Sequence, residues 1–164
     1  MEQLLVLKYN TNPISKNKGN AIFIHIAKKK YKFKLVEDNC ESLGSFTNKK
    51  KLGTFGLASS HSFYFGHHIT SVEGGMVCTN DDELYNYAKL FRSHGMVREA
   101  SKETQDKFKE SHPGCNPLFT FAVPGYNLRN QEFNAVLGLS QLPRLQNNVE
   151  VRSENLEIWL NDKF

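Results

Sequence analysis

The chain has 164 residues, of which 39% are hydrophobic and 23% are charged, and its net charge is +4. This composition is sufficient for the packed core of about one domain and excludes wholesale disorder, and no apolar run approaches the ~20 residues that span a membrane. Lysines gather in residues 16–34 and 49–51, but the usual nucleic-acid-binding modules are missing. We therefore interpret both groups as solvated surface and predict neither a nucleic-acid nor a membrane partner.

The three cysteines, Cys40, Cys78 and Cys115, contain no Cys-x-x-Cys pair. This pattern indicates neither a zinc site nor a disulfide framework, and free thiols in a reducing compartment are expected. The start of the chain is too short and too polar for a signal peptide. We accordingly predict a cytoplasmic protein without a metal site.

The first half of the chain alternates between loop and strand patterns. Residues 1–20 are polar and favour loop or disorder, whereas residues 21–31 are typical of a helix with a basic C-terminal end. A loop rich in glycine and lysine is expected from residue 44 to 56. Three segments have the apolar or alternating pattern of strands: residues 32–38, 57–65 and 74–79.

The second half is predicted to be mainly helical. Residues 80–95 have a capping residue, early acids and a terminal glycine, which together predict a helix. Residues 96–120 are predicted to be a long loop, and a loop of that length in a compact domain is often functional. Two more helices are expected at residues 130–142 and 144–164, with Pro143 ending or kinking the first. Alternation of strand and helix favours an α/β sheet.

Two carboxylates, Glu37 and Asp38, end the first predicted strand. Ligand sites of α/β sheets lie at the carboxyl ends of strands, and a carboxylate there can pair with a protonated ring nitrogen of a cofactor. The alternative is an acid that only caps a helix.

The segment from residue 60 to 75 carries serines, two adjacent histidines and a pair of glycines. Serines at a strand end can donate hydrogen bonds to a phosphate. Neighbouring residues on a strand point to opposite faces, so at most one of His67 and His68 is expected to face a site. A histidine in such a cleft is either a general base or a structural residue. Asn127, before a later helix, is either a helix cap or a ligand-binding group.

Together, in this order and spacing, several segments resemble the DegT/StrS family of sugar aminotransferases and dehydratases, which are pyridoxal phosphate enzymes of the aspartate aminotransferase fold (type I). The matching motifs are VEDNCESLG, KLGTFG, SFYFGHHITSVEGGMVCTND, LFRSHG and GYNLRNQEFNAVLGLSQL. The resemblance implies an α/β fold with a mostly parallel sheet flanked by helices. Residues 26–164 would form the C-terminal part of the cofactor-binding large domain, residues 1–25 match no part of it, and the small C-terminal domain would be absent.

The resemblance also implies roles for individual residues. Asp38 would pair with the pyridine nitrogen of the cofactor. Glu41 takes a position near the cofactor's ring oxygen where most aminotransferases of the family carry glutamine. Ser62 would bind the cofactor phosphate, and Asn127 would reach the phosphate in the partner's site across a homodimer interface.

His67 stands where the aminotransferases of the family carry the lysine that forms a Schiff base with the cofactor. A site without this lysine resembles the sugar-nucleotide 3-dehydratases, and FYFGHH with Glu41 looks most like the branch that acts on GDP-4-keto-6-deoxymannose in the colitose route. The related CDP-hexulose branch carries an iron–sulfur cluster, which needs about four thiolates, and the three dispersed cysteines do not match that requirement.

The reaction implied by this resemblance uses pyridoxamine phosphate, a 4-keto-6-deoxyhexose nucleotide and glutamate. His67 would remove a proton from the cofactor's methylene carbon and donate one to the departing 3-hydroxyl, and glutamate would then restore the amine form of the cofactor. Members of the family are about twice as long as this chain or longer, so a truncated form with weak or absent activity is expected. The alternatives are a sugar-nucleotide aminotransferase and an inactive fragment that associates with a full-length paralogue.

Overall fold

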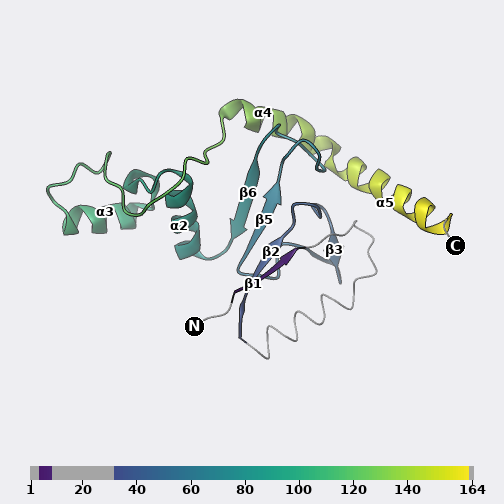
Figure 1. Cartoon of the computed structure of the whole chain (residues 1–164), viewed down its shortest axis with the longest axis horizontal. Coiled ribbons are helices and arrows are strands. Elements are labelled where there is room, and N and C mark those ends of the chain that lie inside the picture. The colour runs from purple at the N-terminus through teal and green to yellow at the C-terminus, as the bar shows by residue number, and fades with distance from the viewer. Residues whose placement is uncertain (1–3, 9–31, 163–164) are drawn as a thin grey trace. The chain divides into compact units, whose positions relative to one another are not determined.

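The computed structural model describes residues 4–8 and 32–162 (Figure 1), so the helix predicted at residues 21–31 lies outside the described part of the chain. The described residues form two compact units. The first includes the chain up to Cys78 and again from Gln131, and the second is Thr79–Asn130. Each unit is described by itself.

The first unit contains a four-stranded sheet in the order β1-β2-β5-β6, with β1 at Leu4–Lys8, β2 at Lys34–Asp38, β5 at Ala58–Ser62 and β6 at Gly75–Thr79. β2 pairs in parallel with β1 on one side and with β5 on the other, and Figure 1 shows β6 running opposite to β5. The strands predicted around β2 and β6 are confirmed. The polar average of residues 1–20 concealed the apolar run Leu-Leu-Val-Leu, so the loop prediction is wrong at β1.

A short antiparallel hairpin interrupts the loop that the sequence predicts between β2 and β5. It consists of β3 (Phe46–Thr47) and β4 (Lys50–Lys51). The two residues between these strands, Asn48 and Lys49, both have positive φ, at 48° and 63°. Two consecutive positive φ values are the requirement of the tight hairpin turn whose twist matches the flanking strands.

Two helices complete the first unit. α4 (Glu132–Gln141) passes into a 3-10 turn, η2 (Leu142–Arg144), and then into α5 (Leu145–Asn161). Both helices were predicted, and Pro143 lies in the 3-10 turn that ends α4, as expected from its missing N–H. No helix in the described ranges is both long enough and apolar enough to cross a bilayer.

The second unit contains α2 (Asp82–Arg92), the 3-10 turn η1 (Val97–Glu99) and α3 (Lys102–Ser111). The helix predicted at residues 80–95 is confirmed, although it ends at Arg92. The long loop predicted at residues 96–120 is wrong, because it contains η1 and α3. No residue of α3 is buried, so its sequence carries no apolar periodicity; the helix is instead capped by the Ser101 side chain and bears two ion pairs at i,i+4 spacing.

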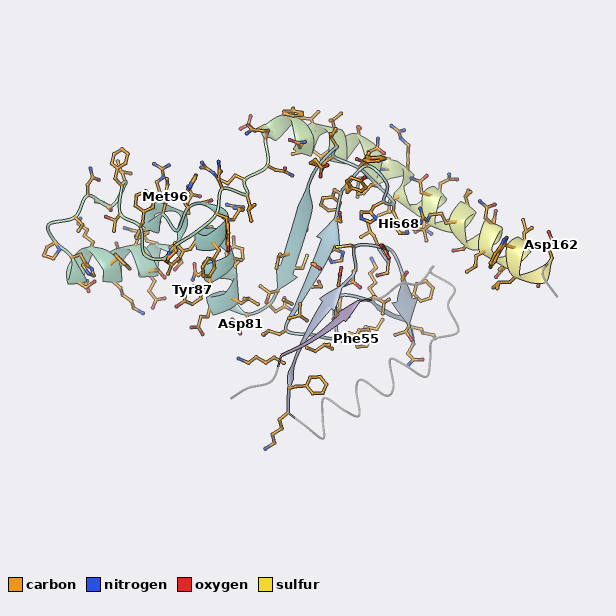
Figure 2. All side chains as sticks on the ribbon, viewed as in Figure 1. Phe55, His68, Asp81, Tyr87, Met96 and Asp162 are labelled. Atoms are coloured by element: carbon orange, nitrogen blue, oxygen red, sulfur yellow. The ribbon has the colours of Figure 1, made fainter. Side chains whose placement is uncertain are left out.

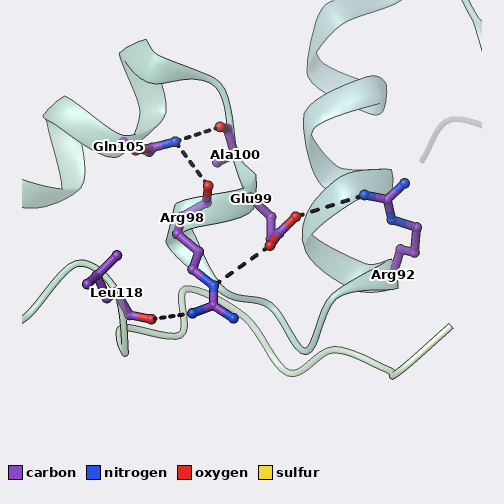
Figure 3. A network of polar contacts seen from close by, with 6 residues as sticks. All are labelled: Arg92, Arg98, Glu99, Ala100, Gln105 and Leu118. Atoms are coloured by element: carbon purple, nitrogen blue, oxygen red, sulfur yellow. Dashed lines mark hydrogen bonds and ion pairs between the residues drawn. The ribbon is translucent and has the colours of Figure 1, made fainter. Parts of the chain in front are cut away.

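A polar network joins the elements of the second unit (Figure 3). Glu99 lies 3.9 Å from the Arg92 guanidinium and 3.7 Å from that of Arg98. Gln105 donates from α3 to the carbonyl oxygens of Arg98 and Ala100, at 3.2 and 3.0 Å. Because these ion pairs are partly exposed, they contribute little to stability, and we infer that they mainly orient η1 relative to α2.

Candidate functional site

The carboxyl ends of β2 and β5 bring a carboxylate and two hydroxyls to one face of the sheet. Asp38 pairs in register with Ser60, and alternation along β5 puts Ser62 on the same face. The Ser60 hydroxyl donates to Asp38 Oδ1 at 3.3 Å, and the backbone N–H of Cys40 donates to the same oxygen at 3.1 Å. Asp38 is therefore held in a fixed orientation at the sheet edge, and it is only half-buried.

Glu37, on the opposite face of β2, has a different function. Its side chain is fully buried, and its two carboxylate oxygens accept hydrogen bonds from the backbone N–H groups of Gly53 at 2.8 Å, Phe55 at 2.7 Å and Gly56 at 2.7 Å. This carboxylate anchors the loop that precedes β5. The sequence predicts that Glu37 and Asp38 both lie at a ligand-binding edge, whereas the structure assigns only Asp38 to the candidate site.

A third histidine lies on the same face as Glu37. His61 Nε2 is 3.2 Å from the Ser59 hydroxyl. Burial lowers the pKa of His61, although the nearby carboxylates of Glu37 and Asp38 act in the opposite direction. His61 is not among the site residues predicted from the sequence. His61 lies between Ser60 and Ser62 on β5. Because side chains alternate along a strand, it faces away from the candidate site.

His67 and His68 lie in a loop and not on a strand. β5 ends at Ser62, and backbone hydrogen bonds from Phe63 to Gly74 and from Ser71 to Phe63 close the loop. The predicted strand therefore ends three residues too late, and the expectation that the two histidines occupy opposite faces of a strand is wrong. Because this segment turns back on itself, both side chains border one hollow against α5.

The two histidines differ in burial. His67 is half-buried, its N–H donates to the Tyr64 carbonyl at 3.1 Å, and its ring meets the edge of the Tyr64 ring at a centroid distance of 5.8 Å. His68, shown next to α5 in Figure 2, is only 4% exposed. The pKa of His68 is lowered to about 4. Burial is the largest cause, followed by the charges of Arg152 and His67. His67 is thus the histidine that solutes can reach.

Two asparagine side chains hold this histidine loop. Asn134 of α4 donates to the carbonyl oxygens of Ser71 at 2.6 Å and Glu73 at 3.4 Å. Asn148 of α5 donates to the carbonyl oxygen of His68 at 3.0 Å. Neither asparagine was predicted from the sequence. Asn134 is buried, where a side-chain amide is nearly always hydrogen-bonded, but no local sequence signal marks this contact.

Replacing Asn148 with alanine is expected to destabilise the first unit by about 1–3 kcal/mol, because the carbonyl of His68 loses its donor in a partly buried position. The His67 N–H should exchange with solvent faster, as measured by NMR. Asn147, adjacent but exposed, makes no hydrogen bond to the loop, and Asn147→Ala is the matched control. Equal exchange rates in the two variants would contradict the assigned role of Asn148.

The remaining predicted residues take separate positions. The side chain of Ser62 is half-buried and accepts a hydrogen bond from the Tyr64 N–H at 3.3 Å. Glu41 is exposed just beyond β2. Asn127 belongs to the second unit, where its side chain is exposed and its backbone forms a bridge with Ser93. No three His, Cys, Asp or Glu side chains of the described ranges are grouped as metal ligands.

Comparison with known proteins identifies relatives of this chain. Over 130 residues, covering 79% of this chain, it is 40% identical to the GDP-4-keto-6-deoxy-D-mannose 3-dehydratase of Escherichia coli O55:H7, of which it covers 33%. It is also 38% identical over 126 residues, 77% of this chain, to the UDP-4-amino-4,6-dideoxy-N-acetyl-beta-L-altrosamine transaminase of Helicobacter pylori, of which it covers 30%. The chain spans about a third of the length of these curated relatives.

A solved structure agrees with the sequence matches. The E. coli GDP-4-keto-6-deoxy-D-mannose 3-dehydratase with bound hydrated pyridoxal phosphate superposes with a TM-score of 0.78 at 32% identity, covering 98% of this chain and 40% of that one. This likeness confirms the predicted α/β fold class. The model of the DegT/DnrJ/EryC1/StrS aminotransferase family matches residues 23–162, and the chain belongs to this family.

Proposed function

We propose that this chain carries active-site residues of a sugar-nucleotide 3-dehydratase that uses pyridoxamine phosphate and acts on a 4-keto-6-deoxyhexose nucleotide. The observation that carries the proposal is the parallel pairing of β2 and β5, which puts Asp38 and Ser62 on one face and one edge, with an imidazole, His67, on the loop that follows. Residues 26–164 would correspond to the C-terminal part of the cofactor-binding large domain, and the family match over residues 23–162 supports this.

The residues at the sheet edge fit the cofactor. When bound, the cofactor supplies an electron sink that stabilises negative charge next to the reacting carbon. Asp38, whose Oδ1 is fixed by Ser60 and by the Cys40 N–H, would pair with its protonated ring nitrogen. The Ser62 hydroxyl would donate a hydrogen bond to the cofactor phosphate, and Glu41 would lie near the cofactor's ring oxygen.

His67 would perform the proton transfers. An imidazole both accepts and donates protons near neutral pH, so one group can take the proton from the cofactor's methylene carbon and give a proton to the departing 3-hydroxyl. An amine at this position would instead capture the aldehyde form of the cofactor and favour transamination. The partial exposure of His67, in contrast to the buried His68, supports the choice between the two histidines.

The proposal also includes a homodimeric assembly and a cytoplasmic location. Asn127 would contact the cofactor phosphate in the partner's site of a homodimer, and its exposed side chain supports this role. Glutamate would restore the amine form of the cofactor. Cys78 and Cys115 are exposed free thiols, which supports a cytoplasmic location.

Replacing His67 with lysine tests the proposal. The purified chain is expected to bind pyridoxal phosphate reversibly, whereas His67→Lys should trap it covalently after borohydride reduction, at residue 67 and near one cofactor per chain. His112→Lys, at an exposed position in the second unit, is the matched control and should gain no such adduct at residue 112. Peptide mapping by mass spectrometry reports the site. Absence of both a cofactor absorbance change and an adduct at residue 67 would contradict the proposal.

A further inference from the structure

The hollow between the histidine loop and α5 has a volume of about 310 Å³. Its lining residues include one apolar side chain and no carboxylate, and they are His67, His68, Asn147, Asn148, Val151 and Arg152. The guanidinium of Arg152 makes this space positive, because no carboxylate lines it to neutralise the charge.

His68 adds an independent observation. Its side chain is 4% exposed, and neither ring nitrogen has a hydrogen-bond partner in the described part of the chain. A neutral imidazole has one N–H donor and one acceptor, and buried polar atoms are nearly always satisfied. A buried ring without partners that borders a hollow therefore indicates that its partner is not among the described residues.

The guanidinium of Arg152 is also available to bind a ligand in this hollow. It makes no ion pair and donates no hydrogen bond within the described ranges, and its α5 position presents it to the same hollow as His68. The planar guanidinium is suited to an oxyanion, since its parallel N–H groups match two oxygens of a phosphate or carboxylate.

We propose that this hollow binds a phosphate-class oxyanion, held by the guanidinium of Arg152, the ring N–H of His68 and the side-chain amide of Asn147. The anion is either free phosphate or the phosphoryl group of a larger molecule. This site is distinct from the cofactor phosphate position proposed at Ser62 and Asn127. It stands whether or not His67 is a catalytic residue.

The test uses the imidazole of His68 as a reporter. The charged groups facing this ring are Arg152 on α5 and His67 on the loop, and both lower its pKa. A bound phosphate anion opposes them, so the pKa of His68 should rise by about one unit. NMR titration of the full chain from pH 3.5 to 8 measures this shift, in chloride, inorganic phosphate and a nucleoside diphosphate at matched ionic strength.

Variants decide the outcome. Arg152→Gln should lose the phosphate-dependent rise in the pKa of His68, and Arg144→Gln, an exposed arginine outside the hollow, should keep it. Asn147→Asp, which adds a carboxylate to the lining, should also lose it. A larger rise with the diphosphate identifies a phosphoryl group as the ligand, and an equal rise identifies free phosphate. No rise with either anion, or an undiminished rise in Arg152→Gln, overturns the proposal.

Discussion

Replacing Glu37 with alanine is expected to lower the free energy of unfolding by about 3–5 kcal/mol, which is a large part of the stability of a small domain. The carboxylate is fully buried and accepts three backbone hydrogen bonds, from Gly53, Phe55 and Gly56. The variant leaves these three amides without an acceptor, and each unsatisfied buried group costs about 1–3 kcal/mol before the loop relaxes.

The measurement is urea unfolding at pH 7, followed by circular dichroism. Glu37→Gln keeps one acceptor oxygen but directs an NH₂ group at a backbone N–H, so we expect an intermediate loss of about 2 kcal/mol. Glu154→Ala, at an exposed position on α5 of the same unit, is the control and should change stability by less than about 0.5 kcal/mol. A Glu37→Ala variant as stable as this control would show that the loop finds other acceptors.

The contrast between Glu37 and Asp38 shows where sequence reasoning stops. The sequence predicts that both carboxylates end a strand at a ligand-binding edge, and the strand is there. The separation of their roles depends on backbone N–H groups of residues 53–56, about 16 to 19 positions away. Their alternation along β2 could have indicated opposite faces, but no local pattern indicates which face the loop covers.

Helices with an apolar stripe could be predicted, and a helix without one could not. α2 has a capping Asp81 and the buried Leu90, and it was found. α3 buries no residue, so its helicity rests on a serine cap and exposed ion pairs, which a periodicity argument does not detect. The asparagine contacts to the histidine loop join residues 61 to 80 positions apart, and they become visible only in the folded chain.

The stability of the chain is expected to fall as the pH is lowered from about 6.5 to 4, because the pKa of His68 in the folded chain is about 4. Above pH 6.5 the imidazole is neutral in both states, so it contributes no pH dependence. Between these values the unfolded chain binds a proton that the folded chain does not, which favours unfolding. Below pH 4 both states are protonated and the loss is complete.

The size of this loss follows from the shift. The full difference in pKa corresponds to about 3 kcal/mol, and solvent screening at the open hollow reduces the expected loss to about 2 kcal/mol. Urea unfolding in chloride buffers from pH 4 to 7 measures it. His68→Phe should remove this share of the pH dependence, while the exposed His112→Gln should keep all of it. The lowered pKa of His61 acts in the same direction, so some dependence should persist in His68→Phe. An unchanged dependence in His68→Phe would mean that the His68 ring has the same pKa in the folded and unfolded chains, contrary to its burial next to Arg152.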